Sequence, residues 1–148
     1  MEEIQAIADE YDAKVLLDGC DSLGSKWANK HLSEYAVASS CSLFPAHHIS
    51  TLQGGMISSN DSQLIQIARS MGSWGKWCYC SGAGNLLPNG CCGKRFSAWL
   101  PDQPDLILDH RYVFTTDKAY NTQPLDIQGA LGIEQMKRIE KIELAVLS

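Results

Sequence analysis

Short apolar runs that alternate with amphipathic segments are the feature that most constrains the fold of this chain. In the first segment, MEEIQAIADEYDA, the apolar side chains recur at helical spacing: Ile4, Ile7, Ala8 and Tyr11. The next run, KVLLDGCDSLGS, is a short apolar strand cut off by Asp and Gly, and YAVASSCSLF and GGMISSND predict two more strands. This alternation is typical of an α/β sheet. It places Asp18 at the carboxyl end of a strand, the edge at which such sheets bind ligands.

The second half of the chain is less regular. Asn60 or Asp61 can cap a helix that runs to about Met71. Residues 72 to about 120 are rich in Gly, Pro, Asn and Cys, and no helical or strand periodicity is sustained there. This predicts an irregular, cysteine-containing insertion. Pro124 is expected to start an amphipathic helix toward Leu147, with the apolar positions Ile127, Leu131, Ile133, Met136 and Ile139. Because only about three strands are visible, we expect residues 1–148 to form part of a larger domain.

Composition excludes several classes of function. The chain has 148 residues, of which 45% are hydrophobic and 20% charged, as in one globular domain. Its net charge of -5 and scattered basic residues give no footprint for nucleic acid. No apolar run reaches the ~18 residues that span a membrane. The acidic N-terminus does not resemble a secretory leader, so we expect a cytoplasmic protein without membrane or nucleic-acid partners.

The six cysteines need another explanation than disulfides, because the cytosol keeps thiols reduced. Four of them crowd into the stretch CYCSGAGNLLPNGCC: Cys78, Cys80, Cys91 and Cys92. Both zinc and iron–sulfur clusters take thiolate ligands. The local spacing is not that of a zinc ribbon, and by itself it leaves zinc, a cluster and plain buried thiols equally open.

Two further features carry titratable groups. A carboxylate at the end of a buried strand, such as Asp18, either caps the next turn or contacts a ligand; a protonated pyridine nitrogen is one such ligand. His47 and His48 are adjacent in SLFPAHHISTLQGG, where an extended backbone directs neighbouring side chains to opposite sides. An adjacent histidine pair is more often structural than catalytic, although a histidine that reaches a substrate can act as a base.

Four stretches of the sequence, which contain these features, resemble the motifs of one enzyme family. LLDGCDSLGS, SLFPAHHISTLQGG, CYCSGAGNLLPNGCCGKRF and AYNTQPLDIQGALGIEQMKRIEKI resemble, in order and approximate spacing, the DegT/StrS-type sugar aminotransferase and dehydratase family. These are vitamin B6 enzymes of fold type I, and the likeness is strongest to its CDP-4-keto-6-deoxyglucose 3-dehydrase branch. The resemblance runs from Val15 to Ile142. It implies part of the large, aspartate aminotransferase-like domain, a three-layer α/β/α fold.

The resemblance also implies a cofactor and a base. His47 stands where most of the family carries the lysine that binds pyridoxal phosphate covalently, and an imidazole cannot form that Schiff base. The branch therefore uses pyridoxamine phosphate, with His47 as the base in loss of the C3 hydroxyl from CDP-4-keto-6-deoxy-D-glucose. Asp18 matches the partner of the pyridine nitrogen, and Ser42 matches a contact to the cofactor phosphate.

Two further positions carry over from the family. Asp21 falls where relatives have a side chain beside the cofactor ring. Asn121 falls where a residue reaches the cofactor phosphate of the neighbouring subunit, which implies a homodimer.

Members of the branch also carry a [2Fe-2S] cluster. Cys20, Cys78 and Cys80 match three of its four ligands, and Cys92, directly before GKRF, matches the fourth, with Cys91 as a rival. The cluster relays electrons from a flavin and iron–sulfur reductase.

The chain departs from the family pattern in ways that limit these expectations. Leu52–Gln53 replaces the usual Gly-Glu, and the upstream phosphate loop and the small C-terminal domain of the family are absent. We therefore expect a fragment that is inactive alone. The alternatives are a non-catalytic remnant of an aminotransferase-family protein and a zinc-stabilised binding module on the four clustered cysteines.

Overall fold

The computed structural model describes residues 1–76, 96–98 and 102–146 of the chain. The chain divides into two compact units, one of residues Met1–Ile65 with Pro124–Ser148, the other of residues Gln66–Gln123. Among the described helices, none is long and apolar enough to cross a membrane.

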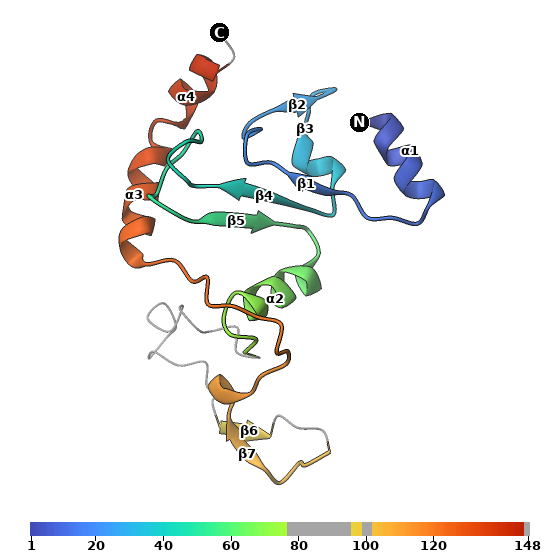
Figure 1. Ribbon diagram of the computed structural model, residues 1–148, viewed down its shortest axis with the longest axis vertical. Coiled ribbons are helices and arrows are strands. Elements are labelled where there is room, and N and C mark those ends of the chain that lie inside the picture. Colours follow the sequence, from blue (N-terminus) through green and yellow to red (C-terminus); the bar gives the residue numbers. More distant parts are fainter. Residues whose placement is uncertain (77–95, 99–101, 147–148) are drawn as a thin grey trace. The chain divides into compact units, whose positions relative to one another are not determined.

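A mixed three-stranded sheet is the centre of the first unit (Figure 1). Its strands are β1 (Leu16–Asp18), β4 (Ala38–Ser42) and β5 (Gly55–Ser58), in the order β1-β4-β5. β1 and β4 are parallel, with Asp18 opposite Ser40, whereas β5 runs antiparallel to β4. The three strands expected from the sequence are therefore present.

Helices flank this sheet in the sequence as expected. α1 (Glu2–Glu10) precedes β1, and α2 (Ser62–Met71) follows β5. Asp61 caps α2, because its Oδ1 accepts hydrogen bonds from the amides of Gln63 (2.8 Å) and Leu64 (3.2 Å). This settles the choice between Asn60 and Asp61 as the cap.

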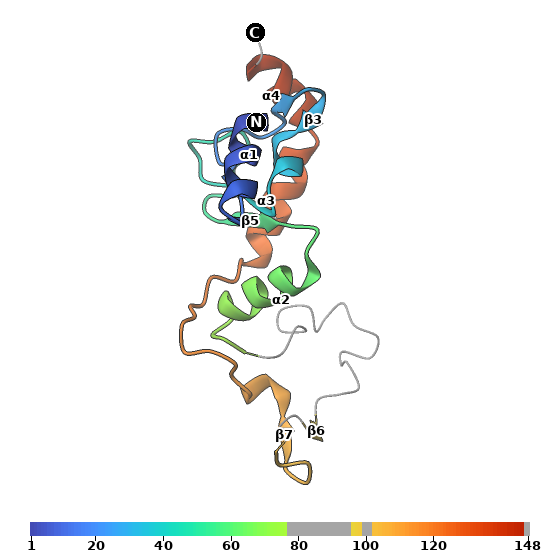
Figure 2. The ribbon, with the colours of Figure 1, turned by 90° about the vertical axis from the view of Figure 1, so that its right-hand side faces the viewer.

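The C-terminal helix differs from the sequence prediction. It starts at Asp126 rather than Pro124 and is interrupted, giving α3 (Asp126–Met136) and α4 (Ile139–Val146) (Figures 1 and 2). At the interruption the Arg138 carbonyl accepts bonds from the amides of Lys141 and Ile142 and so begins α4. No Gly or Pro stands there, which is why the apolar period did not reveal the break.

Two short hairpins were also not predicted. β2 (Lys26–Trp27) and β3 (Lys30–His31) pair antiparallel in the first unit, followed by the 3-10 turn η1 (Leu32–Tyr35). In the second unit β6 (Phe96–Ala98) pairs with β7 (Ile107–Asp109), and a 3-10 turn, η4, covers His110–Tyr112. The two-residue strands β2 and β3 are too short to show the period of two by which strands are recognised.

The apolar core of the described residues is small. Ala8, Ala38 and Ile49 are its buried apolar side chains. Several large apolar side chains of the first unit are instead exposed: Ile4, Ile7, Leu16, Met56, Ile57, Ile127, Ile133 and Met136.

Gly19 gives a test of the parallel strand pair. A Cβ at residue 19 would lie 2.6 Å from the Ser40 carbonyl oxygen, whereas a Cβ at Gly129, in α3, would meet nothing within 4 Å. We expect Gly19→Ala to lower the free energy of unfolding by about 1–3 kcal/mol through steric overlap. The matched variant Gly129→Ala should raise it by ~0.5–1 kcal/mol. Urea unfolding measures both; equal effects of the two variants would contradict the close approach at Gly19.

Candidate functional site

The carboxyl ends of β1 and β4 carry a hydrogen-bonded carboxylate. Asp18, the last residue of β1, accepts hydrogen bonds at Oδ1 from the Ser40 hydroxyl (2.9 Å) and the Cys20 amide (3.2 Å). The Cys20 thiol, the Ser40 hydroxyl and the Cys20 amide, in this order of effect, hold the pKa of Asp18 below its usual value. The result is an exposed carboxylate that stays ionised.

Cys20 is tied to the same carboxylate. Its Sγ lies 3.7 Å from the Ser40 Oγ. The neighbouring Asp18 raises the pKa of the Cys20 thiol, while the Ser40 hydroxyl opposes this effect. Asp18 therefore favours the protonated thiol form of Cys20.

His47 forms the second pair at this edge. Its Nδ1 lies 2.7 Å from Oδ1 of Asp21, a short distance typical of a charge-assisted hydrogen bond. The Asp21 side chain is 89% exposed and that of His47 only 21%. His47 also acts on the first carboxylate, because it contributes to the lowered pKa of Asp18.

Backbone turns fix both members of this pair. The Ser22 amide donates to the Gly19 carbonyl (3.2 Å), which closes the turn that carries Asp21 after β1. The His47 amide donates to the Phe44 carbonyl (3.0 Å), which closes a turn after β4. Because β1 and β4 are parallel neighbours, residues 26 positions apart in the sequence meet at one edge of the sheet.

Ser42 and His48 lie near the pair in the sequence. Ser42 ends β4, and its Oγ accepts a hydrogen bond from the Phe44 amide (3.2 Å). A hydroxyl that accepts this bond still has its own proton to donate. Nδ1 of His48 is buried and has no hydrogen-bond partner among the described residues.

The structure thus brings most of the predicted residues of the first unit together. Asp18, Cys20, Asp21, Ser42 and His47 all belong to the ends of β1 and β4 or to the turns that follow them. Asn121 belongs to the second unit, where it forms an antiparallel bridge with Ser73.

The cysteine cluster is a separate case. The other predicted metal ligands, Cys78, Cys80, Cys91 and Cys92, lie outside the described residues. Within the described part of the chain, no group of three or more potential metal ligands is found.

Sequence reasoning missed Ser40 and the bond between Asp21 and His47. Ser40 stands two residues before Ser42 and faces Asp18 only because of the parallel register of β1 and β4. Two residues of one strand that differ by two positions share a face, so the Ser40–Ser42 spacing was the available signal.

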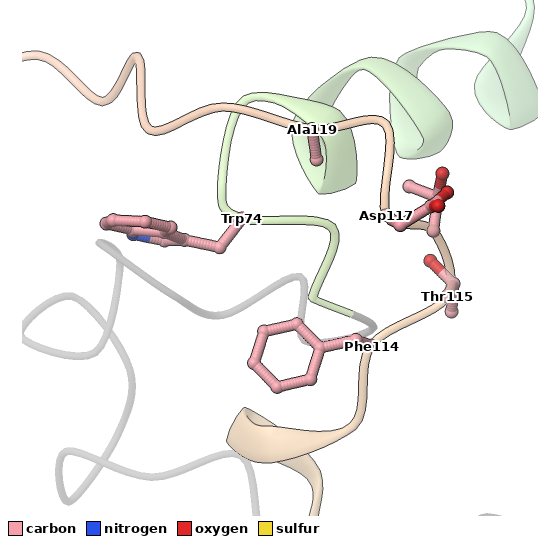
Figure 3. Close-up of a pocket in the computed structure, with 6 residues that line it drawn as sticks. Trp74, Phe114, Thr115, Asp117 and Ala119 are labelled. Atoms are coloured by element: carbon pink, nitrogen blue, oxygen red, sulfur yellow. The ribbon is translucent and has the colours of Figure 1, made fainter.

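The second unit holds a pocket of its own. Figure 3 shows the rings of Trp74 and Phe114 on one side of it, with Thr115 and Asp117 on the other. Gly75 follows Trp74 with φ +73, and a Cβ there would lie 2.2 Å from the Thr116 carbonyl oxygen, so only glycine fits. None of the predicted site residues lines this pocket.

Comparison with known proteins gives a consistent set of relatives. A profile of the DegT/DnrJ/EryC1/StrS aminotransferase family matches residues 1–144. The lipopolysaccharide biosynthesis protein RfbH of Salmonella typhimurium is 33% identical over 142 residues, which are 95% of this chain and 31% of that protein. The dTDP-4-dehydro-2,6-dideoxy-D-glucose 3-dehydratase of Saccharopolyspora spinosa is 32% identical over 139 residues, 93% of this chain and 29% of that protein.

Solved structures agree with the sequence matches. The Escherichia coli GDP-4-keto-6-deoxy-D-mannose-3-dehydratase with bound hydrated PLP superposes with a TM-score of 0.67 at 29% identity, over 94% of this chain and 32% of that chain. The expected α/β fold of the fold-type-I vitamin B6 enzymes is confirmed. The chain spans less than a third of the length of these relatives.

The lowered pKa of Asp18 has a consequence for stability. A carboxyl whose pKa is lower in the folded than in the unfolded state stabilises the fold above the unfolded value of about 3.9, and this stabilisation is lost as the pH falls through the folded value. We expect the wild type to lose more stability between pH 7 and the acid range below about 3.9 than Asp18→Asn does. Urea unfolding at several pH values measures this. If the exposed control Asp12→Asn reduces the acid sensitivity as much as Asp18→Asn, the donors around Asp18 do not lower its pKa as described.

Proposed function

The chain belongs to the DegT/DnrJ/EryC1/StrS aminotransferase family, and on that premise we propose that it forms part of the cofactor-binding domain of a cytoplasmic nucleotide-sugar 3-dehydratase. One observation carries the proposal. His47 stands where the family resemblance expects the cofactor-binding lysine, and it lies with Asp21 at the sheet edge that also presents Asp18. A histidine in that place retains proton transfer and loses covalent attachment of the cofactor.

The residues at this edge suit a vitamin B6 cofactor. Asp18 stays ionised because three donors point at its carboxylate, and an ionised carboxylate is the partner that a protonated pyridine nitrogen needs. When bound, pyridoxamine phosphate supplies an amine for the 4-keto group of the sugar and a ring that takes up electrons. A relative of known structure carries bound hydrated PLP, which supports this choice.

His47 is the proposed base. A carboxylate oxygen only accepts hydrogen bonds, so the bond to Asp21 uses the Nδ1 proton of His47 and leaves Nε2 as the proton acceptor. Ser42 has a hydroxyl proton to donate to a phosphate oxygen. Asn121 is proposed to reach the cofactor phosphate of a neighbouring subunit, which makes the functional protein a homodimer.

A larger domain accounts for the exposed apolar side chains. In the first unit, Leu16 of β1 is 69% exposed, Ile57 of β5 is 57% exposed and Ile133 of α3 is 64% exposed. Apolar surface of this kind is normally covered by further structure. The relatives are three times as long as this chain, which supports the proposal that additional segments complete the domain.

The proposed substrate is CDP-4-keto-6-deoxy-D-glucose, which would lose its C3 hydroxyl. Two of the relatives named above are 3-dehydratases of dTDP- and GDP-linked 4-keto sugars, so a nucleotide-linked 4-keto sugar is the supported class. The match to a lipopolysaccharide biosynthesis protein supports a role in making deoxysugars for that polymer. The cytidine base follows from the resemblance of the motifs to the CDP-sugar branch.

A [2Fe-2S] cluster on Cys20, Cys78, Cys80 and Cys92, or Cys91 in place of the last, is the proposed electron carrier. A flavin and iron–sulfur reductase is the proposed electron donor. Cluster assembly requires Cys20 as a thiolate, although Asp18 raises its pKa. Metal ions deprotonate a coordinating thiol, so we propose that iron replaces the Cys20 proton.

A lysine at residue 47 should restore covalent binding of the cofactor. After incubation with pyridoxal phosphate and reduction with borohydride, His47→Lys is expected to gain one phosphopyridoxyl group at residue 47. The matched control is His31→Lys, at an exposed histidine of β3, which should stay at background labelling. Peptide mass spectrometry locates the label. Equal labelling of residues 31 and 47 would remove residue 47 from the cofactor site.

Substitution of Cys20 distinguishes the proposed iron–sulfur cluster from a local zinc site on the four clustered cysteines. After anaerobic addition of iron and sulfide, Cys20→Ser should lose the bound iron, the sulfide and the visible absorbance of the cluster, because one of four thiolates is gone. Cys41→Ser, at a part-buried cysteine of β4 whose pKa is raised by burial, should keep them. Metal analysis measures both variants. Zinc bound equally by both, without any cluster, would favour the zinc-stabilised module.

A further inference from the structure

The bond between Asp21 and His47 has a role that the family resemblance does not assign. The resemblance places Asp21 beside a cofactor ring, whereas the structure places its carboxylate 2.7 Å from Nδ1 of His47. We propose that Asp21 is a positioning residue, which holds the neutral His47 in the tautomer with the proton on Nδ1. The proposal rests on the function proposed above, in which His47 is the base.

The donor and acceptor inventory determines the tautomer. A neutral imidazole has one protonated and one unprotonated nitrogen, and an ionised carboxylate has only acceptor atoms. The nitrogen that contacts Asp21 must therefore carry the proton, and the lone pair is then on Nε2. Without Asp21 both tautomers are open to His47, and a fraction of the molecules has its acceptor nitrogen in the wrong place.

The surroundings of the pair support a role in orientation rather than in packing. The Asp21 side chain is 89% exposed, so it fills no space in a core. The His47 side chain is 21% exposed and lies in a turn closed by its own amide. A carboxylate in water keeps its charge without a buried cation, and it can hold one imidazole nitrogen while the side chain itself contributes little to stability.

Asp18 does not take over this task. Its Oδ1 already accepts from the Ser40 hydroxyl and the Cys20 amide. The two carboxylates differ in their partners: Asp18, the last residue of β1, accepts from Ser40 of β4, and Asp21, in the turn after β1, contacts the imidazole. Asp21 is therefore the carboxylate that contacts His47, and Asp18 has other hydrogen-bond partners.

Nitrogen NMR of the imidazole rings tests the proposal directly. In the wild type His47, identified by the signal lost in His47→Gln, should show a protonated Nδ1 and an unprotonated Nε2. Asp21→Asn, which keeps the size but can donate to Nδ1, should shift the population toward protonated Nε2. Asp21→Ala, a second variant without any donor, should also shift it, and Asp21→Glu should restore the wild-type tautomer at least in part.

Controls distinguish positioning from a general loss of structure. Asp12→Asn, at an exposed aspartate of the same unit, should leave the His47 signals unchanged, and the backbone amide spectrum reports whether each variant folds. If the wild-type His47 carries its proton on Nε2, or if folded Asp21→Asn and Asp21→Ala keep the wild-type tautomer, Asp21 is not the positioning residue.

A second measurement separates this inference from the proposed function. In a full-length protein that contains this chain and is loaded with pyridoxamine phosphate, exchange of the cofactor C4′ hydrogens with solvent should be at least ~10-fold slower in Asp21→Asn, with recovery in Asp21→Glu. Loss of the tautomer without any change in exchange would leave the positioning role standing and exclude His47 as the base. An unchanged tautomer would overturn the positioning role whatever the exchange rate.

Discussion

The parallel pairing of β1 with β4 is the constraint on which the rest of the described site depends. It sets Asp18 opposite Ser40 and extends beyond the strand, since the Gly19 amide donates to the Ser40 carbonyl (3.1 Å). This close approach requires glycine at residue 19, because a Cβ there would overlap with the same carbonyl. A shift of the register by one residue would direct the Ser40 hydroxyl to the opposite face of the sheet and leave Asp18 without it.

The electrostatics of the site follow from this geometry. Two carboxylates lie within a few residues of the end of β1, and each has a different environment. Asp18 is ionised and saturated with donors at Oδ1, whereas Asp21 is exposed and bound to one imidazole nitrogen. Cys20, between them in the sequence, has a thiol pKa that the neighbouring Asp18 raises. In the proposed enzyme these three residues therefore serve different chemistry: Asp18 serves the cofactor, Asp21 the base and Cys20 the metal.

Much of the fold was accessible from the sequence. The strands at Leu16–Asp18, Ala38–Ser42 and Gly55–Ser58 follow from short apolar runs, and a helix cap at Asn60 or Asp61 follows from side-chain chemistry, although only the structure chose Asp61. The interruption between α3 and α4 was not predictable, because Lys137 and Arg138 are good helix formers and the apolar period continues across them. The β2–β3 hairpin escaped because each strand has two residues.

By itself, the sequence determined the family and the kinds of group at the site: an acid at a strand end, a histidine in place of a lysine and a distant cysteine before a C-x-C pair. Only the tertiary structure decided which of these groups act together. The Ser40 hydroxyl and the Cys20 amide donate to Asp18, and the Asp21 carboxylate contacts Nδ1 of His47. The contacts of Ser40 with Asp18 and of Asp21 with His47 join positions 22 and 26 residues apart. They are set by strand register and turn geometry, which local patterns of hydrophobicity and charge do not report.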